Sequence, residues 1–271
     1  MLLTLCAGLL CCTPLNSSDD DDFSPTDDDD SSAGDDDDSA PSYTQSWTAS
    51  FSAEALTQLS AENSAGRLSL SGSPGAGAVE TLVTVYSDSP VDLGPFAPLT
   101  ISEFPDSLSV VVSAPESAEI SRIDLSVHAP SSLVAQLTSS NFPLALSDMR
   151  AGGTINAGGG SVTGIGLAGN FEVSGGDSEL LLELELPVDG VLHAVLASGP
   201  IELLLPATTS ANLSASAHGG SIQITGMNFD GVVAGGEAQG QFGDGEGSIT
   251  LSTDAGDIVI RGQEPAPLPG N

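Results

Sequence analysis

Paired carboxylates are the feature of this sequence whose residue types and spacing best suit catalysis. The segment SELLLELEL contains Glu179, Glu183 and Glu185, and the last two lie two apart on one expected strand, so their side chains point to the same side. Glycosidases hold two carboxyl groups about 5–9 Å apart across the sugar that they cleave. One hypothesis is therefore a carbohydrate-active enzyme built on a β-solenoid. In so acidic a chain, a solvated outer face explains the same pairing more simply.

A second group of acidic residues surrounds the last glycine-rich stretch. Its members are Asp244, Glu246, Asp254 and Asp257. Carboxylate oxygens are the ligands that calcium prefers. The sequence predicts no cofactor, although these four residues could form a weak calcium cluster.

The other residue types that do chemistry are not arranged as sites. His128, His193 and His218 each fall in or beside an expected strand, without a second histidine at metal-binding spacing. No G-x-S-x-G nucleophile motif occurs, and the glycine-rich segment 158–166 lacks the lysine of a phosphate-binding loop. The sequence therefore predicts a protein that is not an enzyme.

The charge of the chain excludes one class of partner. Its 271 residues include 37 acidic residues against four arginines and no lysine, giving a formal net charge of −33. Binding to nucleic acid is driven by lysine and arginine side chains that neutralise phosphates. We therefore expect no nucleic-acid partner.

The three cysteines, Cys6, Cys11 and Cys12, all lie in the apolar segment MLLTLCAGLLCC, residues 1–12. This segment is too short for a membrane-spanning helix, which needs about 20 apolar residues. It resembles the signal and lipid-acceptor cysteine of a bacterial lipoprotein, which implies that Cys12 (or Cys11) carries a lipid that anchors the chain to a membrane. The alternative is a secretory signal that is cleaved without lipidation.

Two segments are expected to be linkers. Residues 13–45 contain the runs Asp19–Asp22, Asp27–Asp30 and Asp35–Asp38, whose like charges repel and extend a chain that has little to bury. This acidic segment is predicted to be a disordered spacer rather than a calcium site, since it lacks the alternating ligands and glycine turn of a calcium loop. Residues 264–271 are predicted to be a disordered tail.

From residue 46 to 263 the pattern is that of an all-β protein. Short runs with apolar residues two apart are separated by Gly, Pro, Asp or Ser, as in RLSLSG at residues 67–72 and ETLVTVYS at residues 80–87. Residues 46–106 form either a separate β-subdomain or the first coils of the same domain.

One unit recurs along this region: a strand, a polar link with a glycine, then a second strand. SAHGGSIQITG (216–226) and STDAGDIVIRG (252–262) are two of the copies. A tight turn with a positive φ suits the glycine of each link. The expected turn glycines are Gly66, Gly160, Gly176, Gly199, Gly220 and Gly256. A single unit cannot bury its apolar face alone, so stacked copies predict an irregular β-solenoid, with a β-sandwich as the alternative.

Residues 107–262 resemble a family. A strand ending in proline (RIDLSVHAP, 122–130), a long aliphatic strand (IELLLP, 201–206) and a glycine-rich stretch (240–262) occur in the order seen in the bacterial "putative adhesin" β-strand-repeat family, a domain of unknown function. The resemblance implies a stacked β-strand fold in an exported, envelope-associated protein, with no established catalytic residues.

These observations lead to an expected function. The chain is predicted to be a non-enzymatic lipoprotein of the cell envelope or surface, whose adhesin-like β-repeat domain mediates binding or structural contacts. It would be exported and then anchored at the outer membrane, in the periplasm or on the cell surface.

Overall fold

The structure is a computed structural model that describes residues 43–88, 99–113 and 120–263. Within these ranges every regular element is a β-strand, which confirms the all-β prediction. Burial alternates along the strands: in β4 (Ala78–Ser87), Val79, Thr81, Val83 and Val85 are buried, while Glu80, Leu82 and Thr84 between them are more exposed. The predicted lipid-acceptor cysteines, the aspartate runs and the tail at 264–271 lie outside the described residues. Within them, no helix is long and apolar enough to cross a membrane.

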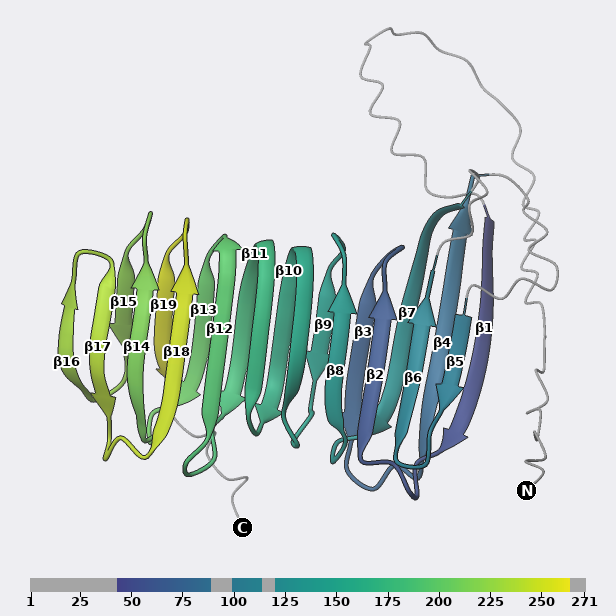
Figure 1. The fold of residues 1–271 in the computed structure, drawn as a ribbon, viewed down its shortest axis with the longest axis horizontal. Helices are drawn as coiled ribbons and strands as arrows, with labels where there is room; N and C mark the ends of the chain where they lie inside the picture. Colours follow the sequence, from purple (N-terminus) through teal and green to yellow (C-terminus); the bar gives the residue numbers. More distant parts are fainter. Residues whose placement is uncertain (1–42, 89–98, 114–119, 264–271) are drawn as a thin grey trace, which may run out of the picture.

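The strands pair into two layers that face each other (Figure 1). In spatial order, layer 1 contains β5 (Leu99–Glu103), β6 (Ser107–Val112), β2 (Gln58–Asn63), β8 (Val134–Ser139), the first halves of β10 (Gly153–Ala168) and β11 (Phe171–Glu185), β12 (Val191–Ser198), β18 (Gly247–Thr253), β14 (Ala211–Ala217), β17 (Glu237–Phe242) and β16 (Phe229–Ala234). Layer 2 contains β1 (Tyr43–Ser52), β4, β7 (Ile120–Pro130), β3 (Leu68–Ser73), β9 (Leu144–Ser147), the second halves of β10 and β11, β13 (Ile201–Pro206), β19 (Ile258–Gln263) and β15 (Ile222–Thr225).

Each repeat unit forms one coil, with one strand in each layer. Neighbouring coils pair in parallel, as β2–β3 do with β8–β9, and β10 and β11 run through both layers without a break. Parallel stacking of this kind is that of a flattened β-solenoid rather than an antiparallel sandwich. Antiparallel strands end the stack: β4, β1 and β5 at one end, and β17 and β16 at the other.

The order of coils in space differs from their order in the chain. The last coil, β18–β19, lies between β12–β13 and β14–β15. At the other end, β6 pairs with the edge of β2 that faces away from β8, and β7 pairs with the edge of β3 that faces away from β9. The region 46–106 is therefore part of the common stack and not a separate subdomain. β1 begins at Tyr43, so the folded domain starts before the expected boundary at 46, and Tyr43–Gln45 belong to a strand rather than to the linker.

Aliphatic side chains in register fill the space between the layers. One such row joins five neighbouring strands of layer 1 and is fully buried: Ala61, Leu137, Ile155, Val173 and Ala194. Full burial of an aliphatic side chain of the size of Val, Leu or Ile contributes about 1.5–3 kcal/mol. Because the core is shared, a single unit by itself would leave its apolar face exposed to water.

The corners between the layers explain the repeated glycines. Gly160, Gly199 and Gly256 have positive φ angles of 80°, 106° and 147°, as expected, whereas Gly66, Gly176 and Gly220 do not. Close packing between coils is the more general reason. A Cβ on Gly220 would overlap the carbonyl oxygen of Gly256, and one on Gly256 would overlap that of Gly199. The two similar segments 216–226 and 252–262 are thus direct neighbours whose backbones touch at the corner.

Candidate functional site

The outer side of layer 2 carries a groove lined by six of its strands, β1, β4, β7, β3, β9 and β10, together with Ile101 of β5. Strand register arranges its outward side chains in two rows. The first row is Thr48, Leu82, Ser126, Ser69, Ala145 and Thr163; the second is Ser50, Glu80, His128, Ser71, Ser147 and Ile165. These side chains come from segments far apart in the sequence, and parallel stacking brings them side by side.

Short side chains make this surface hollow. The groove encloses about 1140 Å³. Serine, alanine and His128 occupy its middle strands, while Leu82 and Ile165, which are 40% and 49% exposed, stand on either side. The arrangement is a broad, open depression with hydroxyl groups in the middle and apolar groups at its margins. A surface of this kind suits contact with an extended ligand.

The hydroxyl groups of the groove are held by hydrogen bonds. Ser69 Oγ donates to Ser126 Oγ at 2.9 Å, and Ser71 Oγ lies 3.0 Å from His128 Nδ1. Serine and histidine are a nucleophile and base of hydrolases. Glu80 stands opposite His128 in the register, but no ion pair among the described residues joins them. The pair is therefore not built as a Ser-His-acid triad.

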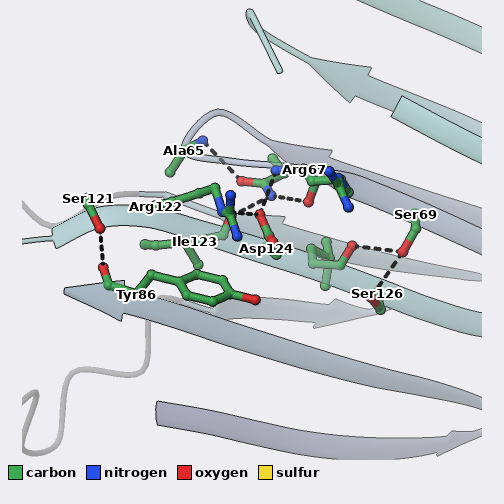
Figure 2. A network of polar contacts seen from close by, with 11 residues as sticks. Ala65, Arg67, Ser69, Tyr86, Ser121, Arg122, Ile123, Asp124 and Ser126 are labelled. Carbon is green, nitrogen blue, oxygen red and sulfur yellow. Dashed lines mark hydrogen bonds and ion pairs between the residues drawn. The ribbon is translucent and has the colours of Figure 1, made fainter. Parts of the chain in front are cut away.

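A cluster with two arginines adjoins the groove along the same strands (Figure 2). Asp124 is its centre: Oδ1 accepts a hydrogen bond from the backbone N–H of Arg67 at 2.9 Å and lies 3.2 Å from Nε of Arg122. The guanidinium of Arg122 also lies over the ring of Tyr86, 4.2 Å from its centroid, a cation–π contact. Because the chain has only four arginines, this cluster concentrates half of its cationic side chains.

A buried asparagine fixes the backbone beneath the cluster. Asn63 Nδ2 donates to the carbonyl oxygens of Arg67 and Ile123, both at 2.9 Å, and its Oδ1 accepts from the N–H of Ala65 at 3.0 Å. Asn63 is fully buried, so these bonds satisfy polar groups that water cannot reach. Ser121 Oγ donates to the carbonyl oxygen of Tyr86 at 3.0 Å, which ties β7 to β4 (Figure 2).

The calcium candidates are not brought together. Asp244 and Glu246 precede β18, and Asp254 and Asp257 follow it, so the strand separates the two pairs. Within the described ranges, no three Asp, Glu, His or Cys side chains are close enough to hold a metal ion.

Each of the two pairs has a structural role instead. The N–H groups of Asp244 and Glu246 donate to Ser210 Oγ at 3.1 and 3.3 Å. Asp257 joins neighbouring coils: its Oδ1 accepts from the backbone N–H and Oγ of Ser221 at 2.7 and 2.8 Å. These two hydrogen bonds, the backbone one first, lower the pKa of Asp257. Asp254 Oδ1 lies 3.5 Å from His218 Nδ1.

The paired carboxylates lie on one side of β11, as the spacing predicts. Glu179, Glu183 and Glu185 all point to the outer side of layer 2. None of them lines the groove. The groove therefore does not bring these carboxylates to a place where they could act on a bound sugar.

Sequence reasoning missed the groove and the arginine cluster. His128 was expected to be an ordinary strand-surface residue, and the outward serines look like those of any half-buried strand. The only signal is the run of small outward residues in RLSLSG, next to one of the four arginines. Neither the small residues nor the arginine next to them shows which strands are neighbours in the fold.

No protein-family model matches the sequence, and no curated protein matches it. Several solved structures do. A "putative cell adhesion protein" from Clostridium sporogenes is 14% identical, with a TM-score of 0.49, over 82% of this chain and 100% of the other. A "putative adhesin" from Bacteroides fragilis is 10% identical, with a TM-score of 0.34, over 82% of this chain and 98% of the other. A third, from Parabacteroides merdae, is also described as a "putative adhesin". It is 10% identical, with a TM-score of 0.30, over 81% of this chain and 97% of the other.

The words "adhesin" and "cell adhesion" are said of those three proteins. The solenoid itself rests on the strand pairing of this chain.

Proposed function

We propose that this chain is an exported, adhesin-like binding protein without a catalytic role, and that the groove on the outer side of layer 2 is its contact surface. The groove carries the proposal, because it is a large hollow lined mainly by hydroxyl and apolar side chains, with Glu80 as its one acidic residue, on an otherwise strongly acidic chain. Its serine hydroxyls both donate and accept hydrogen bonds.

The chemistry of the groove favours an uncharged polysaccharide as the ligand. Sugar hydroxyl groups match the hydroxyls of Ser69, Ser71 and Ser147, and the C–H faces of sugar rings match the exposed side chains of Leu82 and Ile165. The net charge of −33 disfavours polyanions at the domain as a whole.

The N-terminal segments fit this role as an anchor and a spacer. A lipid on Cys12 (or Cys11) would hold the chain at a membrane, because each buried methylene contributes about 0.8 kcal/mol. The aspartate runs between residues 19 and 38 would repel one another and keep the domain away from that membrane.

The test of the contact surface is binding of the full chain to insoluble neutral polysaccharides and to whole bacterial cells. Ala145→Tyr places a large ring in the middle of the groove, on an outward position that is already exposed. We expect it to abolish binding. Gln223→Tyr is the matched control, because Gln223 is also exposed on layer 2 but lies outside the groove.

Equal binding by both variants would contradict the groove as the contact surface. Release of soluble sugar by the unaltered chain would contradict the absence of a catalytic role. Protease treatment of intact cells, followed by mass spectrometry of peptides from 43–263, tests exposure on the cell surface.

A further inference from the structure

The groove is much longer across the strands than along them. Six neighbouring strands of layer 2, from β1 to β10, contribute to it in register. Neighbouring strands are about 4.8 Å apart, so the steps from the first strand to the sixth add up to about 24 Å. The two rows of outward side chains lie two residues apart along each strand, which is only about 7 Å. An elongated ligand that fills the groove therefore lies across the strands, along the horizontal axis of Figure 1.

The size and the regularity of the groove suit a segment of a polymer. Its volume of about 1140 Å³ exceeds the range of about 300–1,000 Å³ that is typical of small-molecule pockets, and it is spread over six strands. Along each row, one outward side chain follows the next about every 4.8 Å. A polymer whose units repeat at a similar distance can contact one strand with each unit. One sugar of an extended, β-linked glycan has a length close to this spacing.

The hydrogen bonds of the groove run in the same direction as its rows. Ser69 Oγ donates to Ser126 Oγ on the neighbouring strand at 2.9 Å, so Ser126 accepts this bond and can donate its own hydrogen to a ligand. In the second row, Ser71 Oγ lies 3.0 Å from His128 Nδ1. Glu80 continues this row on β4, and its carboxylate can accept hydrogen bonds from sugar hydroxyls. Successive strands thus offer polar groups to successive sugars.

We propose that the ligand is an extended, β-linked neutral glycan that lies across layer 2 with one sugar on each of the six strands. This inference rests on the proposed function and adds the linkage, the direction and the length of the bound ligand. An α-1,4-linked glycan curves into a helix, so its sugars do not follow a straight row. The row ends at β10, because the longer side chain of Leu181 follows Thr163 in register. At the other end, β1 pairs with β4 alone among the described strands.

The test is the dependence of affinity on ligand length, measured by isothermal titration calorimetry with the full chain. The probes are β-1,4-linked oligomers of glucose and of N-acetylglucosamine, from two sugars to eight. Each added sugar up to the sixth is expected to raise the affinity roughly threefold, the effect of one hydrogen bond at the low end of the usual net contribution. Beyond the sixth sugar the affinity is expected to stay the same. α-1,4-linked glucose oligomers of the same lengths should bind much more weakly.

The variant Thr163→Tyr tests the direction of the ligand. It places a ring at the β10 end of the first row, so the affinity is expected to stop rising before the sixth sugar, while the shortest oligomer binds as before. Unchanged binding of the shortest oligomer also shows that the variant is folded. Thr163→Ala, which adds no bulk, is expected to weaken only the binding of oligomers with six or more sugars. Thr154→Tyr is the matched control, because Thr154 lies on the same strand and is also half-buried, but faces the outer side of layer 1.

The possible outcomes separate this inference from the proposed function. An affinity that stops rising at two or three sugars would place the ligand along the strands and overturn the inference, as would equal length profiles for the natural chain and Thr163→Tyr. Binding of α-linked oligomers without binding of β-linked ones would also overturn it, yet leave the groove as a contact surface for polysaccharide. If no neutral oligomer or polysaccharide binds, both the inference and the proposed function fail.

Discussion

The two halves of the outer face of layer 2 share one backbone and differ in their side chains. In the half built from β1, β4, β7, β3 and β9, the outward residues at the middle of the surface are serines, alanine and His128. In the half built from β11, β13, β19 and β15, the same rows continue with longer residues: Leu181, Glu202, Val259 and Gln223, then Glu183, Leu204, Arg261 and Thr225. The groove ends at Thr163 and Ile165, where the long residues begin.

This difference shows that the solenoid backbone fixes where the outward side chains lie, while the types of these side chains determine the shape and charge of the surface. Inward residues are aliphatic in both halves, because both contribute to one core. Outward residues are free to vary, since they pack only against their neighbours in the row. One half has become a hollow with a cationic margin, and the other is filled and acidic.

The largest effect is expected from breaking the scaffold that the two halves share. Gly220→Ala would force a Cβ into the carbonyl oxygen of Gly256 on the next coil, so we expect a loss of about 3 kcal/mol in the free energy of unfolding. Gly77→Ala is the control, because no atom lies within 4 Å of its added Cβ and its φ is not positive. Urea denaturation measures both. A Gly220→Ala variant as stable as Gly77→Ala would disprove the backbone contact between coils.

A smaller loss is expected from the corner beneath the arginine cluster. Asn63→Ala removes hydrogen bonds to the carbonyl groups of Arg67 and Ile123 and to the N–H of Ala65, at a cost of about 2 kcal/mol, although the Arg67 carbonyl keeps its bond from the N–H of Leu125. Asn156→Ala, on the exposed side of layer 1, should cost less than about 0.5 kcal/mol. Thermal unfolding of the two variants separates these cases, and equal melting temperatures would count against a supporting role for Asn63.

Removing the margins of the groove should change binding without changing stability. The double variant Leu82→Ser, Ile165→Ser is expected to bind the polysaccharide about fivefold more weakly, because apolar contact with sugar faces is lost. Val134→Ser with Val195→Ser removes two similarly exposed apolar residues from layer 1 and should bind normally. A binding assay on insoluble polysaccharide compares them. Weaker binding by the layer 1 variant alone would move the contact surface to the other layer.

The smallest effect concerns the acidic half and its response to pH. Hydrogen bonds from Ser221 hold the pKa of Asp257 below its usual value of 3.8, so its ionised form stabilises the fold above that pH. This contribution is lost as the pH falls through the lower pKa of the folded state. Asp257→Asn should therefore slightly reduce the drop in melting temperature between pH 7 and pH 3. Asp244→Asn is the control, and an unchanged drop in Asp257→Asn would show that this link between coils adds nothing.

Much of the fold follows from the sequence. Alternating aliphatic residues specify strands, and the glycine between paired strands specifies a unit that must stack, as 216–226 and 252–262 do. The order of the coils does not follow, because the units are short and similar enough to exchange places. Nothing in the pattern of β18–β19 places it between two earlier coils. The expectation of positive φ at all six glycines also ignored backbone contact between coils, which accounts for Gly66, Gly176 and Gly220.

The groove could not be predicted because it depends on register across six strands. Ser69 and Ser126 are 57 residues apart, and their hydrogen bond exists only because β3 and β7 pair in one particular register. The acidic candidates show the opposite case: Asp244 and Asp254 are close in sequence, but an extended strand lies between them. Because a strand rises about 3.3 Å per residue, residues at its two ends are far apart in space even when they are close in sequence.

The placement of the last coil has a consequence for how the chain folds. In the described structure, β15 pairs only with β19, and β14 joins the stack only through β18. Residues 211–225 are made before 247–263, yet they have nothing to stack on until those later residues arrive. Strands β18 and β19 connect β14 and β15 to the rest of the stack. The stack therefore stays incomplete at this end until residues 247–263 have been synthesised. A chain held short of that point keeps an unfinished, extended end, the form in which polypeptides are carried across membranes.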